Sequence, residues 1–327
     1  MIYSMKKLII SIHVLLGLLA CANTSFAQVE MQGSQFIFDK TYINPAFSGI
    51  GGGFNANLHY QLNDVGQQSG KSYTISAGAN IALNQVKSGL GVNVVRNVFG
   101  NDSYTMGYGN YVYHLPVSST TVLSSGVSLG IQQFDINLSG LTTVSQNDPL
   151  AARNIYSSKL DARFGLTGTF NNKFYVGASF DNILSLYTKK DDYYNQVPPT
   201  FRKINMYLIA GANLAYDSGM QVQPSILFIK NFGGITSIDA NAILTFDNSI
   251  SFGIGFRQRI EESQSVAINA DDKSISQSIL RPMIQYQVNK GKQSVKIGYC
   301  YSFNAGNSIN VGSKGSHDLT LIFGLPK

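Results

Sequence analysis

The sequence predicts an all-β protein: a transmembrane antiparallel β-barrel of about 14 strands with short periplasmic turns and long extracellular loops. Three observations lead to this prediction. Apolar and polar residues alternate along nearly the whole chain after residue 53, as they do in strands with two different faces. Most alternating segments run 9 to 13 residues, close to the ~9–11 that a tilted strand needs to cross a bilayer. The links between them differ in length according to side: every short turn falls on one side of the predicted sheet and every clearly long loop on the other.

The composition excludes two other classes of protein. Charged residues make up 13% of the 327 residues, about half the usual share, and the mean hydropathy is +0.01. Few charges with ordinary hydrophobicity exclude disorder driven by charge. No basic run follows the first seven residues, which excludes a nucleic-acid binder with a dense Lys/Arg stripe.

The N-terminus has the pattern of a signal peptide, predicted over residues 1–27. Lys6 and Lys7 precede an apolar stretch over residues 8–20, which is too short to cross a bilayer as a helix. Small residues before Gln28 suit type I cleavage after Ala27. A lipoprotein box ending at Cys21 competes with it. We favour type I cleavage, because Leu at the second position of that box is unusual.

The barrel is predicted over residues 54–327, after an N-terminal periplasmic or lumenal segment over residues 28–53. Its predicted strands are 54–63, 72–84, 88–98, 103–114, 121–133, 159–170, 174–182, 202–216, 221–229, 236–246, 250–259, 276–288, 293–303 and 316–324. Every clearly long link falls on one side, which is the arrangement of outer-membrane barrels. The even number of strands places both termini on the periplasmic side.

The two faces of the strands distinguish a membrane barrel from a soluble β-sandwich. One face carries Leu, Ile, Val, Ala, Phe and Tyr, which suits lipid, while the other carries mostly Ser, Thr, Asn and Gly. A soluble sheet would expose Lys and Glu on its second face, whereas a lumen can be built from small polar residues. Tyr and Phe can form the interfacial girdles although the chain has no Trp.

Nothing in the sequence predicts an enzyme, a metal site or a cofactor. The three histidines of the predicted mature chain, His59, His114 and His317, lie on different strands without the spacing of a metal site. No Gly-x-Ser-x-Gly segment occurs. Aromatic residues crowd the loop 183–201, where Tyr193, Tyr194 and Phe201 are candidates for binding a protein. The alternative is that they fold back over the mouth of the barrel.

Motifs at both ends of the chain resemble the PorP/SprF family. Near the start, Gln35-Phe36 is followed by Tyr42-Ile43-Asn44-Pro45-Ala46-Phe47-Ser48-Gly49, and near the end Gly298-Tyr299-Cys300-Tyr301-Ser302-Phe303 is followed by Gly315-Ser316-His317-Asp318-Leu319. Tyr111-Val112-Tyr113-His114-Leu115-Pro116 resembles a third stretch of the family pattern. Cys300 and Asp318 stand where the family often has Ser and Glu, and residues 61–70 lack an Arg/Trp-rich character.

The resemblance implies an outer-membrane protein of the type IX secretion system of Bacteroidetes, exported through a cleaved signal peptide and surrounded by outer-membrane lipid. It implies a non-enzymatic role in secreting or anchoring surface proteins such as gliding adhesins, with cargo and secretion machinery as partners. The alternatives are a passive channel for small solutes and a barrel lipase or protease. The cargo, the oligomeric state and the openness of the pore are not predicted.

The same motifs supply the candidate docking residues Asn44, Pro45, Tyr299, Tyr301, Ser316 and His317. For Asn44 and Pro45, two interpretations stand side by side. Proline fixes its own φ and holds the preceding residue extended, which is a structural role. The other interpretation is that the segment 28–53 docks a partner, because loops held by a rigid scaffold often carry function.

Overall fold

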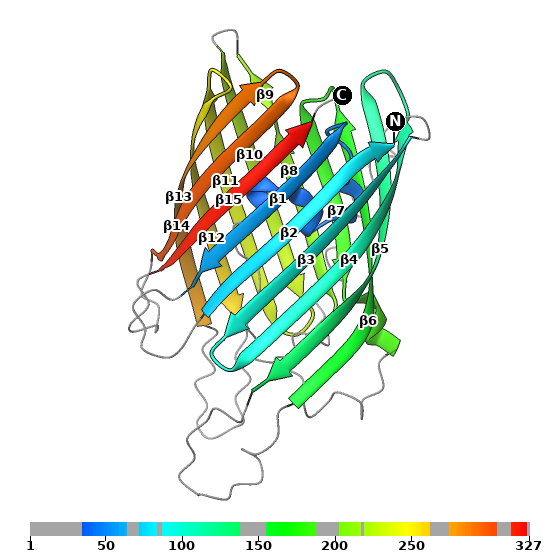
Figure 1. The fold of residues 1–327 in the computed structure, drawn as a ribbon, viewed down its shortest axis with the longest axis vertical. Helices are drawn as coiled ribbons and strands as arrows, with labels where there is room; N and C mark the ends of the chain where they lie inside the picture. Colours follow the sequence, from blue (N-terminus) through cyan, green and yellow to red (C-terminus); the bar gives the residue numbers. More distant parts are fainter. Residues whose placement is uncertain are drawn as a thin grey trace, which may run out of the picture.

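The computed structural model is a closed antiparallel β-barrel that encloses an N-terminal segment of the same chain (Figure 1). The structure describes residues 35–63, 72–83, 87–137, 155–187, 203–216, 219–261, 275–305 and 315–325. None of the helices within these ranges is long and apolar enough to cross a membrane.

The wall has 14 positions, because β8 and β9 are two parts of one strand that both pair with β10. Its strands are β1 (Phe54–Leu62), β2 (Ser72–Leu83), β3 (Ser88–Phe99), β4 (Asp102–Pro116), β5 (Thr121–Ile136), β6 (Ile155–Phe170), β7 (Phe174–Asp181), β8 (Asn205–Ala212), β9 (Leu214–Ala215), β10 (Met220–Asn231), β11 (Ile235–Phe246), β12 (Ile250–Glu261), β13 (Ile275–Lys290), β14 (Gln293–Asn304) and β15 (Ser316–Leu325). Within the described ranges, four short helical elements accompany them: α2 (Gln35–Phe38), η1 (Lys40–Tyr42), η2 (Pro45–Phe47) and η4 (Ile183–Tyr187).

The barrel closes where its first and last strands meet. β1 pairs with β15 along its whole length, from Phe54 opposite Leu325 to Leu62 opposite His317, and every other wall strand pairs with its neighbours in chain order. Closure leaves the sheet without an open edge, so the backbone hydrogen bonds of the wall are made between strands.

The predicted strands and their faces are confirmed. Each of the 14 predicted segments overlaps one wall strand, although the segment 202–216 is broken at Asn213, whose N–H donates to the carbonyl of Lys173. On β1, Leu58 is 46% exposed and points outward, whereas the next residue, His59, is 1% exposed and points into the lumen. The alternation of apolar and polar residues along each strand therefore predicted correctly which side chains face lipid and which face the lumen.

The connections are sorted between the two ends of the barrel. Tight turns such as 171–173 and 247–249 lie at one end, called here the short-turn end, where Asn171 and Asn248 adopt a φ of 52°. Asn tolerates this left-handed conformation better than most residues. The opposite, long-loop end carries the connections 137–154 and 262–274. The chain enters β1 and leaves β15 at the short-turn end (Figure 1).

Candidate functional site

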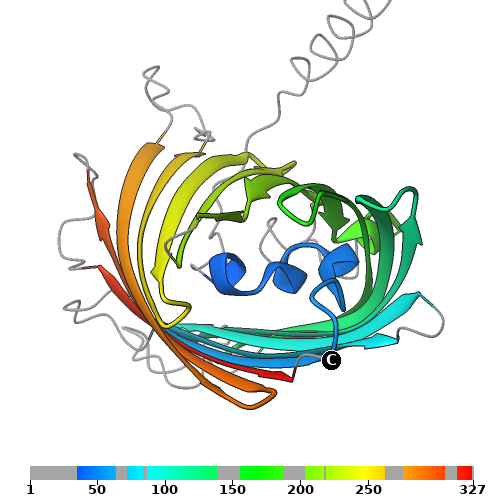
Figure 2. The same cartoon turned by 90° about the horizontal axis from the view of Figure 1, so that it is seen from above.

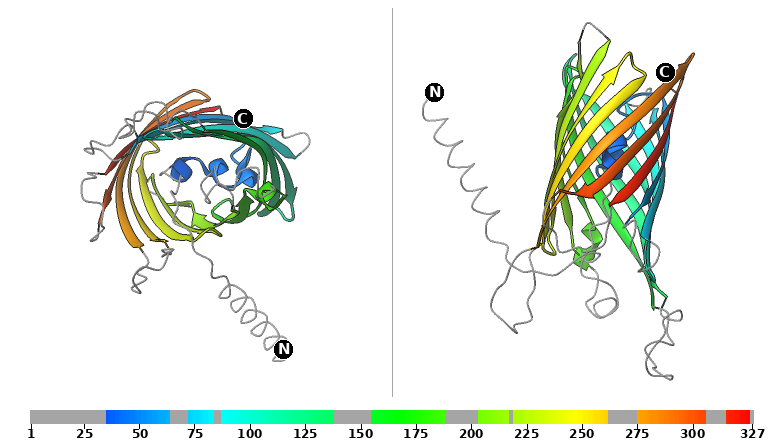
Figure 3. Two further views of the ribbon diagram at one scale, coloured as in Figure 1. Left: turned by 90° about the horizontal axis from the view of Figure 1, so that it is seen from below. Right: turned by 90° about the vertical axis from the view of Figure 1, so that its left-hand side faces the viewer.

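The lumen holds a plug, defined here as residues 35–53. Seen along the barrel, α2, η1 and η2 cross the interior from one wall to the other (Figure 2). The views in Figure 3 place these turns inside the barrel, toward the short-turn end. The sequence predicts that the segment 28–53 lies either in the periplasm or in the lumen. Its described part lies in the lumen. Residues 28–34 lie outside the described residues.

The plug is held first by apolar packing on one part of the wall, whereas most of the other buried, inward-facing wall residues are Ser, Thr, Asn and further polar residues, as predicted. Five plug side chains, Phe36, Ile37, Tyr42, Ile43 and Phe47, form one buried cluster with the wall residues Val95, Tyr175, Tyr207, Ile209, Leu227, Ile229, Ile243, Met283 and Cys300. Burial of each large apolar side chain contributes about 1.5–3 kcal/mol. This part of the wall is apolar inside because the plug, rather than water, faces it.

Asn44 is the polar centre of the plug. Its backbone is extended and its side-chain oxygen accepts a hydrogen bond from the N–H of Ala46 at 2.9 Å, which caps η2. Its amide nitrogen lies 3.2 Å from the carbonyl oxygen of Leu166 and 3.3 Å from that of Ala178, and donates to both. These two residues lie opposite each other on β6 and β7. One side chain thus caps a helical turn and ties it to two strands.

Wall side chains hold the backbone just before Asn44. The carbonyl of Thr41 accepts a hydrogen bond from Asn93 at 3.4 Å, the carbonyl of Ile43 accepts one from Ser179 at 2.7 Å, and the carbonyl of Tyr42, between them, accepts one from Arg163. Asn93, Arg163 and Ser179 are themselves almost fully buried. The donors thus satisfy three buried carbonyls in a row.

Glycines in the wall make room for the plug. A Cβ added to Gly126 on β5 would lie 2.6 Å from the backbone nitrogen of Ala46, and one added to Gly165 would overlap the side chain of Asn44. On β3, a Cβ at Gly91 would lie 2.9 Å from the hydroxyl of Ser48. The backbone of η2 therefore approaches the wall more closely than any side chain would allow.

A charged pair lies at the start of η1. Asp39 accepts hydrogen bonds from the N–H of Thr41 at 2.9 Å and from the amide of Asn57 on β1 at 2.6 Å. The ammonium of Lys40 lies 4.9 Å from the ring centre of Tyr175. Burial lowers the pKa of Lys40, and the neighbouring carboxylate of Asp39 opposes this shift. The cation thus sits over an aromatic face in the lumen.

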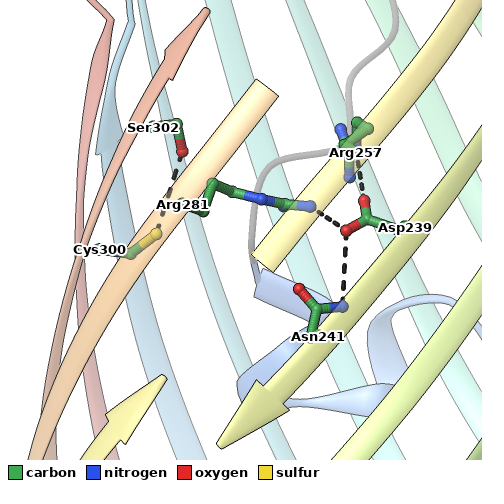
Figure 4. Close-up of polar contacts among 6 residues, drawn as sticks. All are labelled: Asp239, Asn241, Arg257, Arg281, Cys300 and Ser302. Atoms are coloured by element: carbon green, nitrogen blue, oxygen red, sulfur yellow. Dashed lines mark hydrogen bonds and ion pairs between the residues drawn. The ribbon is translucent and has the colours of Figure 1, made fainter. Parts of the chain in front are cut away.

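A second polar cluster lies on the wall of β11, β12 and β13 (Figure 4). Asp239 is fully buried and accepts charge-assisted hydrogen bonds from Arg257 and Arg281, while Asn241 lies 3.5 Å away. Cys300 and Ser302 on β14 complete the group, with 4.0 Å between sulfur and hydroxyl oxygen. Two arginines on one carboxylate satisfy a buried charge that would otherwise be costly.

The three histidines lie on the different strands β1, β4 and β15, as the sequence indicated. His59 Nδ1 lies 2.9 Å from the hydroxyl of Thr320, with Asp318 3.8 Å from its other ring nitrogen. His59, Thr320 and Asp318 are each less than 5% exposed. His114 Nδ1 lies 2.8 Å from the hydroxyl of Ser124. No group of three or more metal-ligating side chains occurs within the described residues.

The structure does not bring the candidate docking residues into one site. Asn44 and Pro45 are buried in the plug. Tyr299, Tyr301 and His317 lie on the outer face near the long-loop end, where the Tyr299 hydroxyl is 2.7 Å from His317 Nδ1 and the rings of Tyr301 and His317 are 5.0 Å apart. Such a cluster is typical of an aromatic girdle at the membrane interface.

The remaining candidates have different surroundings. Ser316 alternates with the outward His317 and lies within 3.5 Å of the amide of Gln61. Tyr193, Tyr194 and Phe201 lie outside the described residues.

The sequence did not predict the wall residues that hold the plug. Arg163, Ser179 and Gly165 look like ordinary lumen-facing residues of alternating strands. One signal was present for the apolar part: residues 225–229 on β10 read Ser-Ile-Leu-Phe-Ile, and a strand that is apolar on both faces is covered on both faces.

Comparison with known proteins gives the family and the fold. The model of the type IX secretion system membrane protein PorP/SprF matches residues 25–323, whereas no curated protein sequence matches the chain. Among solved structures, the CymD monoaromatic hydrocarbon channel is 10% identical with a TM-score of 0.51, over 91% of this chain and 93% of that chain. A Pseudomonas aeruginosa FadL homologue is 9% identical with a TM-score of 0.48, over 86% and 91% of the two chains.

At 10% identity the CymD channel bears on the fold alone, which here is a closed antiparallel β-barrel. The family match extends over nearly the whole chain, from before the plug to the last strand. The protein therefore belongs to the PorP/SprF family of type IX secretion system membrane proteins.

Proposed function

We propose that this barrel is a non-enzymatic outer-membrane component that helps to secrete or anchor surface proteins such as gliding adhesins. Its partners are then cargo proteins and other parts of the secretion machinery, within outer-membrane lipid. Membership of a type IX secretion family supports this proposal.

The observation that carries the proposal is the occupied lumen. Asn44, Pro45 and Ala46 are less than 2% exposed inside the barrel, and five apolar side chains of the plug pack on the wall. A barrel built for passive diffusion of small solutes has a polar, water-filled interior. A plugged barrel fits a protein that acts by binding other proteins.

Loss of the gene is the direct test. We expect deletion to reduce particular secreted proteins in the cell-surface proteome while the uptake of small solutes is unchanged. An unchanged surface proteome together with reduced solute uptake would instead establish the passive channel. The purified wild-type protein is expected to show no steady ionic conductance in a planar bilayer.

The loop 183–201 is proposed as the cargo-binding surface, since aromatic side chains commonly anchor protein interfaces. Replacing Tyr193, Tyr194 and Phe201 together with Ala should leave the barrel folded, as judged by heat-modifiable gel mobility, and should reduce the cargo retained on whole cells. The control is Tyr216→Ala, which removes an exposed aromatic ring from the short-turn end. Equal retention in both variants would exclude the loop as the docking surface.

The proposal includes the absence of catalysis. The hydroxyl of Thr320 and the ring of His59 are buried at 4% and 1% exposure, where a substrate would not reach them. The purified barrel should hydrolyse neither phospholipids nor peptides. Turnover that disappears in His59→Ala would contradict this.

A further inference from the structure

The wall of β3, β6 and β7 contacts the plug as a receptor contacts a peptide. Asn93, Arg163 and Ser179, one from each of these strands, donate to three consecutive carbonyls of the plug at positions 41, 42 and 43. Hydrogen bonds to backbone carbonyls do not depend on side-chain identity. They fix the path of the bound segment and leave its sequence to be selected elsewhere.

Asn44 supplies the selectivity. Its amide offers one acceptor, used by the Ala46 N–H, and one donor group, used by the carbonyls of Leu166 and Ala178. Asp has the acceptor but no donor, so it would place an oxygen against two carbonyl oxygens. Pro45 begins η2 at a position where no backbone N–H is needed. The wall thus fits an Asn-Pro turn.

The space for this turn is built into the wall. Gly165 and Gly177 lie directly under the Asn44 amide, where an added Cβ would overlap its oxygen in the first case and lie 3.0 Å from its nitrogen in the second. Gly126 does the same for the backbone of Pro45 and Ala46, with contacts of 2.6 to 2.8 Å. The recess is therefore specific in shape as well as in hydrogen bonding.

The occupant can leave without opening the barrel. The plug precedes β1 in the chain, and the wall closes through β1 and β15 alone. Among the described residues, the plug forms no ladder pairs with a wall strand. It joins β1 through Gly49, Gly52 and Gly53, whose φ values of 77°, 70° and 65° need glycine. Withdrawal breaks side-chain hydrogen bonds and apolar packing but no hydrogen bond between wall strands. The backbone bond from the Ala82 N–H on β2 to the carbonyl of Gly53 lies next to β1, where the plug joins the wall.

We infer that this recess is a peptide-binding site whose resident ligand is the chain's own segment 41–48. A second peptide that carries Asn followed by Pro, entering from the short-turn end, takes the same place when the plug withdraws. This inference does not depend on the proposed role in secretion, because its tests use the purified protein without cargo.

The first test measures hydrogen exchange in the full-length protein reconstituted in lipid nanodiscs. Asn44→Asp keeps the cap on η2 and loses both donations to the wall. We expect the amides of residues 36–49 to exchange at least about tenfold faster than in the wild type, because about two hydrogen bonds are lost. The amides of β5 and β6 should not change. The control is Asn241→Ala, which alters an equally lumenal Asn whose amide hydrogen-bonds Asp239 on the wall.

Two results would overturn withdrawal of the plug. One is an exchange rate in Asn44→Asp equal to that of the control. The other is plug and wall amides that exchange together, which would mean that the plug opens only when the barrel unfolds.

A disulfide lock gives an independent measurement in a chain that keeps Asn44. A Cβ at position 91 would lie 2.9 Å from the Ser48 hydroxyl oxygen, close to the ~3 Å between Cβ and the partner sulfur in a disulfide. In Ser48→Cys/Gly91→Cys, oxidation should slow exchange of the plug to that of the wall, and dithiothreitol should restore it. Equal rates in the oxidised and reduced forms would contradict release from β3.

The second test measures recognition itself. A fluorescent peptide with the sequence of residues 40–49 should bind saturably to the full-length Asn44→Asp protein, whose own plug no longer competes at high effective concentration. The same peptide with Asp in place of Asn should bind at least about tenfold more weakly. Neither should bind the oxidised double-cysteine protein. Equal binding of the two peptides, or none by either, would overturn the peptide-binding site.

Discussion

Asn44 shows how much one residue can do when its backbone and side chain are used together. Its extended backbone, set by the following proline, turns the amide so that one end caps η2 and the other spans the carbonyls of Leu166 and Ala178. The sequence allowed two interpretations of Asn44 and Pro45, a structural role and a role in docking a partner. The contacts show the structural role directly, and they make any docking role depend on movement of the plug.

At the same scale, the wall glycines predict how to expel the plug. Gly126→Val should place a side chain against the backbone of Pro45 and Ala46, which cannot move aside as a flexible side chain would. We expect the barrel to fold, with normal heat-modifiable mobility, and proteolysis to cut within residues 35–53. Gly109→Val is the matched control, because an added Cβ there meets nothing within 4 Å. Equal protection of the plug in both variants would show that the close contact is not needed.

The buried ion cluster gives a prediction about stability. Asp239→Asn removes the carboxylate shared by Arg257 and Arg281 and should lower the free energy of unfolding by about 3–5 kcal/mol, because a buried charge is left without its partner. Urea unfolding of the barrel in lipid vesicles measures this. Asn241→Ser, on the same strand, should cost much less, and equal losses would mean that the cluster contributes little.

At the scale of the element, alternation along a strand predicted both the strands and their faces. The pattern is local, because successive side chains point to opposite sides of one strand, so it can be seen without knowing the neighbours. The break at Asn213 between β8 and β9 was not predicted, since it depends on which backbone groups the neighbouring strand presents.

The lipid face of β8 tests this register. Leu208 is 43% exposed on the outer surface, and Leu208→Arg should cost about 2–4 kcal/mol near the bilayer midplane. Leu244→Arg should cost less, because Leu244 lies two residues before β11 ends at Phe246 and so closer to the interface. Folding titrations in urea compare the two with the lumenal Asn241→Ser. A large loss in Asn241→Ser and a small one in Leu208→Arg would mean that the register is shifted by one residue.

At the scale of the whole molecule, the sequence predicted a wall but not its contents. The 14 strands and the sorted connections follow from patterns within about 15 residues. The plug instead depends on contacts between residues more than 100 positions apart, such as Asn44 with Leu166 and Ala178. Nothing in the local sequence of β6 or β7 distinguishes a glycine that accommodates a plug from one that faces water. Only the closed barrel brings the two together.

The orientation of the barrel in the membrane is the remaining property at this scale, and the sorted connections predict it. The long-loop end should face outward, since outer-membrane barrels have short periplasmic turns and longer extracellular loops. A cysteine placed at Asn195, in the connection between β7 and β8, should react with a membrane-impermeant maleimide on intact cells. A cysteine at Asn248, in an exposed tight turn at the other end, should react only after the outer membrane is disrupted. The native Cys300 should add no background, because it is fully buried. Labelling of Asn248→Cys and not of Asn195→Cys on intact cells would reverse the orientation, and the plug would then be entered from the cell surface rather than from the periplasm.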